Sequence, residues 1–141
     1  MTTPALPYAQ PKDLLSYAFN KADYDRLDPN SIIPAINAAS DLSNGYLSSQ
    51  FNLPLLKFGS DLTMNVCFIA AFFLQIKIGF NPNSPQDGLI KARYDLAIKW
   101  LESIANEVIH PTYEDTPTDS QNEFVLTTLS RGYNTPTGED I

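Results

Sequence analysis

The sequence predicts an all-α protein, with a compact domain of four helices followed by an extended, largely irregular C-terminal tail. Apolar residues recur at spacings of three and four through much of residues 11–108, which is the period of an amphipathic helix. Pro, Ser, Asn and Gly residues interrupt this pattern at positions typical of helix ends. After residue 109 the periodicity stops, and Thr, Asp, Pro, Gly and Asn dominate. We therefore expect a helical domain over residues 1–108 and a tail over residues 109–141.

The first two predicted helices cover residues 11–20 and about 30–49, with a turn over residues 24–30 between them. Pro11 and Pro34 fall in the first turns, where a missing N–H leaves no hydrogen bond unmade. Gly45 in mid-helix costs roughly 1 kcal/mol relative to Ala, so we expect a close neighbour against it. The apolar sides are Leu14, Leu15, Ala18 and Phe19 in the first helix, and Ile32, Ile36, Ala39, Leu42 and Tyr46 in the second.

The third predicted helix begins at Ser60 or Asp61 and ends at Gly79, and it carries no charge from residue 62 to residue 75. A helix that is apolar on nearly all sides lies either in the centre of a bundle or in a membrane. Spanning a membrane needs about 20 apolar residues, and this run is shorter and contains polar residues. We therefore expect the central helix of the fold, or a helix with one face covered by another subunit, and no membrane contact.

The fourth predicted helix follows residues 81–83 and is capped by Ser84, Pro85 and Asp87. Its apolar positions keep one stripe along the helix, which predicts packing against the other three helices. The stripe consists of Ile90, Tyr94, Ala97, Ile98, Leu101, Ile104, Ala105 and Val108.

The sequence offers little material for catalysis or metal binding. One Cys and one His exclude a disulfide within one chain and a metal site of several Cys or His ligands in a monomer. Cys67 lies in an apolar run, where a free Cys acts as a small apolar filler, and His110 has no nucleophile nearby in sequence. We expect no enzyme, no catalytic residues, no cofactor and no metal; a carboxylate site is the least favoured alternative. The carboxylates of Asp13, Asp25, Asp28 and Asp41 fall at turns and helix caps.

The net charge of −7 argues against nucleic acid as a bound ligand, because phosphate binding needs a cationic stripe. Most of this charge belongs to the tail, where six acids against Arg131 give −5 and leave −2 for residues 1–108. The first ten residues lack the basic start and apolar core of a signal peptide, so secretion is not indicated. The six acids are Glu114, Asp115, Asp119, Glu123, Glu139 and Asp140.

Three groups of residues, in this order and spacing, resemble the small head–tail adaptor proteins of Mu-like tailed phages. The resemblance covers roughly residues 8–108 and lies in packing motifs. The first group is Tyr8, Lys12-Asp13-Leu14 and Phe19; the second is Ala39-Ser40, Gly45-Tyr46-Leu47 and Phe51-Asn52-Leu53-Pro54-Leu55; the third is Tyr94, Ala97, Ile98, Leu101, Ile104 and Ala105.

This resemblance implies a connector-like fold and a structural role without an active site. Proteins of this kind form a ring, commonly of twelve copies, between the portal and the tail, with a bore through which DNA passes. The implied partners are other copies of the chain, the portal protein and a tail-completion or tail-terminator protein, with no sequence-specific nucleic acid binding. The implied location is the neck of the virion, and the host cytoplasm during assembly.

The tail is the predicted contact site in this scheme. A segment of 33 residues reaches about 100 Å when extended, which is far enough to cross a neighbouring subunit or the portal. The residues expected to contact subunits or partners are Phe124, Leu126, Leu129, Arg131 and Tyr133. The alternative is a small non-enzymatic helical module that binds another protein as a monomer or dimer.

Overall fold

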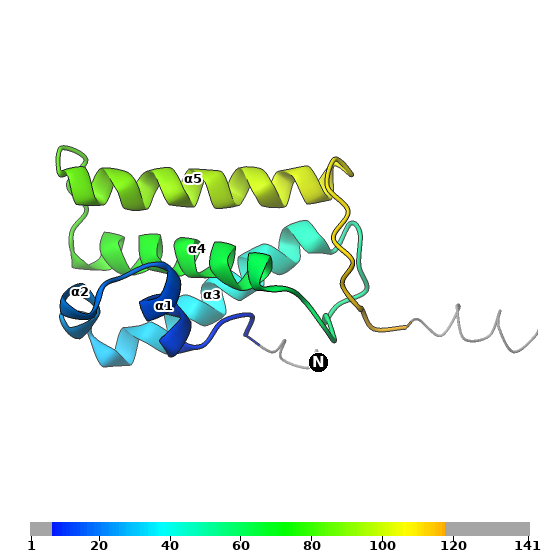
Figure 1. Cartoon of the computed structure of the whole chain (residues 1–141), viewed down its shortest axis with the longest axis horizontal. Coiled ribbons are helices and arrows are strands. Elements are labelled where there is room, and N and C mark those ends of the chain that lie inside the picture. The colour runs from blue at the N-terminus through cyan, green and yellow to red at the C-terminus, as the bar shows by residue number, and fades with distance from the viewer. Residues whose placement is uncertain (1–6, 118–141) are drawn as a thin grey trace, which may run out of the picture.

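The computed structural model describes residues 7–117, and this part of the chain forms five α-helices and no β-strand (Figure 1). The predicted all-α class is confirmed. The helices are α1 (Pro11–Tyr17), α2 (Lys21–Asp25), α3 (Pro29–Leu47), α4 (Ser60–Ile78) and α5 (Pro85–Ala105).

Helix α2 is absent from the sequence prediction, which ended the first helix at residue 20 and placed a turn before the second predicted helix. The Asn20 side chain caps this helix by accepting a hydrogen bond from the Asp23 N–H at 2.8 Å. Lys21 and Asp25, one helical turn apart, form an ion pair of 2.7 Å. No residue of α2 is buried, so the segment lacks the apolar periodicity from which the other helices could be predicted.

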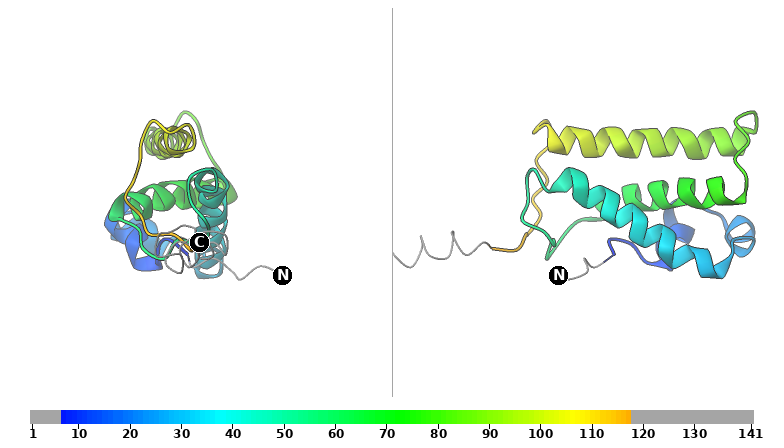
Figure 2. Two further views of the ribbon diagram at one scale, coloured as in Figure 1. Left: turned by 90° about the vertical axis from the view of Figure 1, so that its right-hand side faces the viewer. Right: turned by 180° about the vertical axis from the view of Figure 1, so that it is seen from behind.

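Helix α4 lies at the centre of the fold, in contact with α1, α3 and α5. Figure 1 shows α5 alongside α4, with α1 in front, and the view from behind in Figure 2 shows α3 crossing the opposite side of α4. By length and composition α4 could also cross a membrane, but its buried residues cover most of its circumference and pack among the other helices. They are Leu62, Asn65, Val66, Cys67, Ile69, Ala70, Ala71 and Leu74.

In the connection from α4 to α5, the first helix ends at Gly79 and the second is capped by Ser84, as the sequence predicts. Gly79 ends α4 with a φ of 135°, and Phe80 folds back so that its ring packs edge-on against Phe72 at 5.7 Å. Ser84 caps α5 by accepting from the Asp87 N–H, and the buried Asp87 carboxylate in turn accepts from the Asn81 N–H at 2.8 Å. These bonds satisfy backbone groups that the end of one helix and the start of the next would otherwise leave unpaired.

The expectation that Gly45 has a close neighbour is wrong for the described chain. A Cβ built on Gly45 would have no heavy atom within 4 Å, because this side of α3 is exposed. Pro34 also lies inside α3, since the helix begins earlier than predicted, with Asp28 as its N-cap. Both residues leave an outer face of α3 that nothing in residues 7–117 covers.

Candidate functional site

The predicted contact residues of the tail lie outside the described residues. Helix α5 ends at Ala105, and the chain can be followed to Pro117. The division into a domain of residues 1–108 and a tail of residues 109–141 therefore stays a prediction. The residues outside the described range are Phe124, Leu126, Leu129, Arg131 and Tyr133.

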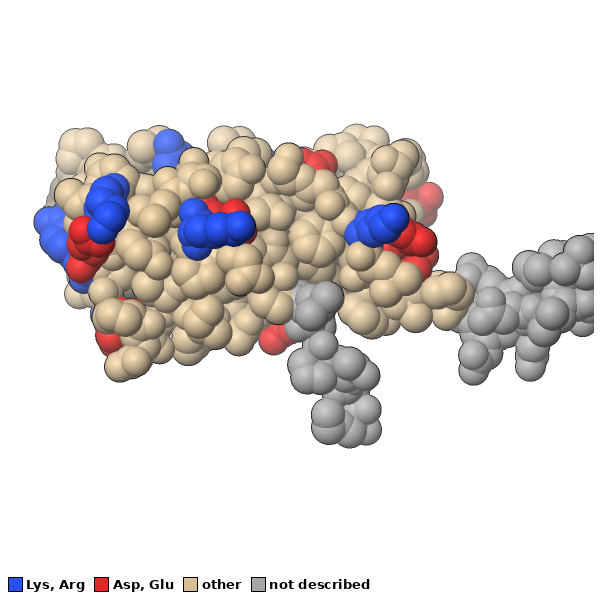
Figure 3. Space-filling model, turned by 60° about the horizontal axis from the view of Figure 1, so that its bottom comes forward, with Lys and Arg blue, Asp and Glu red and all other residues tan. Residues whose placement is uncertain are grey.

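Residues 7–117 hold no group of three or more His, Cys, Asp or Glu side chains that could bind a metal ion. Cys67 is fully buried in α4, and burial, with a smaller contribution from the negative charge of Asp13, raises the pKa of its thiol to about 12. A thiol in this state keeps its proton at neutral pH and is a poor nucleophile. His110 is exposed beyond the end of α5. Charged side chains on the face in Figure 3 form small clusters of both signs, separated by uncharged surface.

Tyr8 fixes the segment before α1 to two long helices. Its backbone N–H donates to the Ser40 hydroxyl at 3.0 Å, and its carbonyl accepts from the Thr63 hydroxyl at 2.8 Å. The Tyr8 hydroxyl donates to the Asn44 side chain, and its ring packs edge-on against Phe58 at 4.9 Å. Burial raises the pKa of the Tyr8 hydroxyl above its ordinary value. The motif residues Tyr8 and Ser40 are thus parts of one packing contact.

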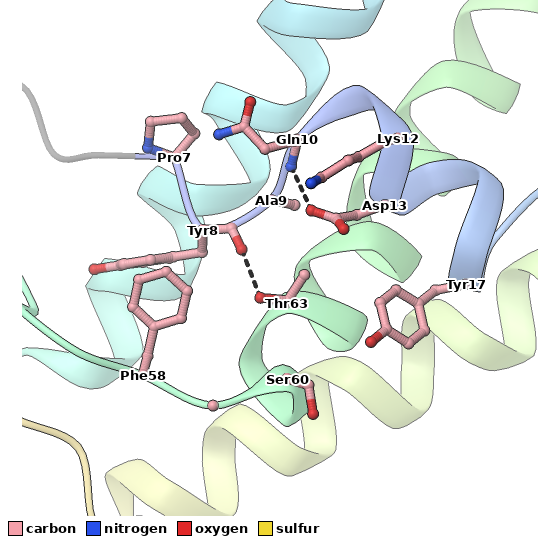
Figure 4. A pocket seen from close by; sticks show the side chains of 11 residues that line it. Pro7, Tyr8, Ala9, Gln10, Lys12, Asp13, Tyr17, Phe58, Ser60 and Thr63 are labelled. Atoms are coloured by element: carbon pink, nitrogen blue, oxygen red, sulfur yellow. Dashed lines mark hydrogen bonds between the residues drawn. The ribbon is translucent and has the colours of Figure 1, made fainter.

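An open pocket of about 450 Å³ lies beside this contact, between α1 and the start of α4 (Figure 4). Two of its polar side chains form structural hydrogen bonds: Asp13 accepts from the Gln10 N–H at 2.7 Å, and Thr63 donates to the Tyr8 carbonyl at 2.8 Å. The pocket could take a side chain or a short segment of another protein. It is lined by Pro7, Tyr8, Ala9, Gln10, Lys12, Asp13, Tyr17, Phe58, Gly59, Ser60 and Thr63.

Residues 110–117, called the strap below, run back from the end of α5 to the loop between α3 and α4. Glu114 pairs with Lys57 in an antiparallel bridge, with backbone hydrogen bonds of 3.1 and 3.0 Å in the two directions. The Asp115 carboxylate accepts from the Asn52 N–H at 2.7 Å. Thr116 donates its N–H to the Asn52 carbonyl at 3.0 Å and its hydroxyl to the Pro54 carbonyl at 2.7 Å. The strap therefore holds a loop that has no regular structure of its own.

Tyr113 is the aromatic anchor of the strap. Its ring stacks on Phe51 with 5.7 Å between centroids, and its hydroxyl donates to Asp61 Oδ1 at 2.5 Å. Burial raises the pKa of the Tyr113 hydroxyl far above its ordinary value, and the hydrogen bond to the Asp61 carboxylate raises it further. The proton is thus held between the strap and the first turn of α4.

Sequence reasoning missed the strap because its composition is that of a tail. Thr, Pro and Asp dominate around it, and no apolar period extends beyond α5. The available signal was Tyr113 followed by Glu114, Asp115 and Thr116, an aromatic anchor beside residues that can pair with a loop backbone. That signal does not identify the loop that is bound.

Residues 7–117 thus define a small helical protein in which the segments before α1 and after α5 are fastened to the helical body. The chain belongs to the bacteriophage Mu Gp36 family, whose model matches residues 6–127, and it is therefore a phage protein. No match to a curated protein was found. The family assignment agrees with the resemblance to Mu-like phage proteins in the sequence.

Proposed function

We propose that this protein is a head–tail adaptor, a structural component that forms a ring between the portal and the tail of a phage particle. Membership in the bacteriophage Mu Gp36 family over residues 6–127 is the observation that carries the proposal. The proposed ring has twelve copies and lies in the neck of the virion, after assembly in the host cytoplasm. In this role the protein needs no cofactor and catalyses no reaction.

The charge of the chain suits a ring around DNA. The net charge is −7, and on the face shown in Figure 3 both signs are mixed and no basic stripe is present to hold phosphates. Negative groups that line a bore would repel the DNA backbone at short range, so that DNA passes without being held. The proposal therefore includes no sequence-specific nucleic acid binding, and no membrane contact.

The strap supports a proposed division of the chain into a helical body and a C-terminal segment that binds partners. It holds residues 110–117 on the loop of residues 52–57, and 24 residues of the sequence follow it. The proposed partners of that segment are a neighbouring copy, the portal protein and a tail-completion or tail-terminator protein. Its proposed contact residues are Phe124, Leu126, Leu129, Arg131 and Tyr133.

Negative-stain imaging of the purified protein mixed with portal particles tests this function. We expect an added ring of density on one end of the portal. Its symmetry should be about twelve-fold if twelve copies close into a ring through identical head-to-tail contacts. The control omits the portal and records the size of the free protein by sedimentation. If no ring and no portal complex form at any salt concentration, the adaptor function is wrong.

The alternative function is a small helical module that binds another protein as a monomer or dimer. The open pocket beside α1 favours it, because such a hollow could receive a segment of a partner. Lys12→Glu and Ser60→Trp change two residues of the pocket lining without removing a described hydrogen bond. If these variants lose partner binding while no ring forms, the module is favoured over the adaptor.

A further inference from the structure

One flank of α5 carries a row of apolar side chains that the described chain leaves uncovered. Leu89 and Leu96 are 51 % and 63 % exposed and lie seven residues apart, on the same side of the helix. Ala92, also exposed, and the half-buried Trp100 continue the row. These four residues are called the α5 ridge. A row of this kind is unlike singly scattered apolar residues and marks a contact surface.

Two cations border the α5 ridge at its middle. The helical period places Arg93 on one side of Leu96 and Lys99 on the other. Neither cation forms an ion pair with a carboxylate in residues 7–117. Arg93 instead lies over the ring of Phe68 at 5.5 Å from its centroid.

The outer face of α3 has the opposite shape and charge. One row of exposed residues along it, at spacings of four and three, has only short side chains, while the exposed Ile33 and Asn37 lie to one side of the row. Asp41 is the only charged residue of α3 and makes no ion pair among the described residues. Gly45 beside it leaves open space where a side chain would stand. The row, called the α3 face, consists of Pro34, Ala38, Asp41, Gly45 and Ser48.

The α5 ridge and the α3 face open on different sides of the molecule. Beside the ridge, Arg93 shares a shallow hollow with Ala18 of the segment that follows α1. Figure 1 shows α1 in front of α3, and Figure 2 shows α3 nearest the viewer from behind. The two rows extend about 17 Å and 21 Å at 1.5 Å per residue, so their lengths are matched. Two different, complementary patches on one subunit give a head-to-tail contact, which generates a ring when the rotation closes.

We propose that the α5 ridge of one copy packs on the α3 face of the next, with Leu96 beside Gly45 and with Asp41 facing Arg93 or Lys99. The occupant of each surface is thus a second copy of this chain. This contact explains the glycine in mid-helix, which lowers helix propensity and which no contact within the described chain requires. The inference rests on the proposed ring and assigns the surfaces that build it.

A complementation experiment tests this contact on the full-length protein. Leu96→Asp places a charge on the ridge, and Gly45→Leu fills the open space on the face while raising helix propensity. Each variant alone should assemble only at a protein concentration at least about tenfold higher than the wild type requires, as expected when one central contact is lost. Mixed in equal amounts, the two variants should form a heterodimer that stops at two, since one intact ridge meets one intact face. The sizes are measured by analytical ultracentrifugation.

Ile78→Asp is the matched control, because Ile78 is 59 % exposed but lies outside both rows. Circular dichroism and urea titration of each variant show whether it is folded. A second measurement uses the double variant Leu96→Cys with Gly45→Cys, the two positions that the proposed contact places side by side, which should give a ladder of disulfide-linked multimers on oxidation. Native Cys67 is fully buried and adds no cross-link. The single variant Leu96→Cys should give no disulfide-linked multimers under the same conditions.

The possible outcomes test the proposed contact and the proposed adaptor function independently. If the wild type forms rings and both variants form them equally well, the contact is wrong while the adaptor function stands. Dimers linked through Leu96→Cys alone, or a mixture that fails to pair, would also overturn the contact. If the wild type forms no multimers and no ring on portal particles, and the double cysteine variant gives no ladder, both proposals are wrong.

Discussion

At the scale of single residues, Cys67 shows how packing removes reactivity from the one thiol of the chain. Its side chain is fully buried in α4, and its pKa is raised to about 12. We expect no reaction with Ellman's reagent at pH 8 in the folded state, because the thiol is both covered and protonated. Adding urea should release one reactive thiol per chain in parallel with loss of the helical signal. Rapid labelling before unfolding would contradict the buried position of Cys67.

Tyr113 gives the fold a dependence on alkaline pH. An unfolded tyrosine ionises near pH 10, whereas burial and the Asp61 carboxylate raise the pKa of Tyr113 in the folded state. Above pH 10 the unfolded chain therefore binds fewer protons than the folded chain, so the free energy of unfolding falls as pH rises. Urea titrations at pH 8 and pH 10.5 should show this fall.

The variant Tyr113→Phe should show a shallower fall over the same pH range, because the shifted hydroxyl is gone. The matched control is Tyr24→Phe, which removes a tyrosine hydroxyl from α2, away from the strap. Tyr8, whose pKa is also raised by burial, leaves part of the pH dependence in both variants. If Tyr113→Phe and Tyr24→Phe behave alike, the Tyr113 hydroxyl does not hold its proton as described.

At the scale of elements, the contacts of the strap predict different stabilities for two shortened chains, one that ends after the strap and one that ends before it. A chain that ends at Pro117 keeps every described contact of the strap, whereas one that ends at His110 loses all of them. We expect the shorter chain to be less stable by about 2–4 kcal/mol, from several net hydrogen bonds and the aromatic stack of Tyr113 on Phe51. The free energies of unfolding are measured by urea titration. Equal stability of the two chains would mean that the strap contributes nothing to the fold.

The same elements show why sequence predicted some of the structure and missed the rest. Helices α3 and α5 repeat buried apolar positions over about 20 residues, so periodicity and caps predict them well, and α4 is predicted by its long uncharged apolar run. Helix α2 buries nothing, and the strap binds through backbone groups and a single aromatic ring. Such contacts depend on which loop the chain meets in space, and a pattern along the sequence does not contain that information.

At the scale of the whole molecule, residues 7–117 form a helical body in which the segments before α1 and after α5 are held by specific contacts. Helix α4 supplies the centre, Tyr8 ties the first segment to α3 and α4, and the strap closes the other end. The α5 ridge and the α3 face remain open, which suits a subunit that repeats around a ring. The sequence predicts that the protein contacts other proteins, but it does not predict which surfaces make the contact. Those surfaces depend on how the helices pack in three dimensions.

Trypsin can report on the proposed partners of the C-terminal segment, because Arg131 is the only Lys or Arg after Lys99. Cleavage there releases residues 132–141, which mass spectrometry detects directly. If the segment binds the portal or a neighbouring copy, we expect cleavage after Arg131 to be about tenfold slower in the portal complex than in the free protein, because cleavage follows the accessible population. An unrelated protein in place of the portal, with a peptide substrate to follow trypsin activity, is the control. Equal rates in both states would show that Arg131 takes no part in docking, even if the ring itself forms.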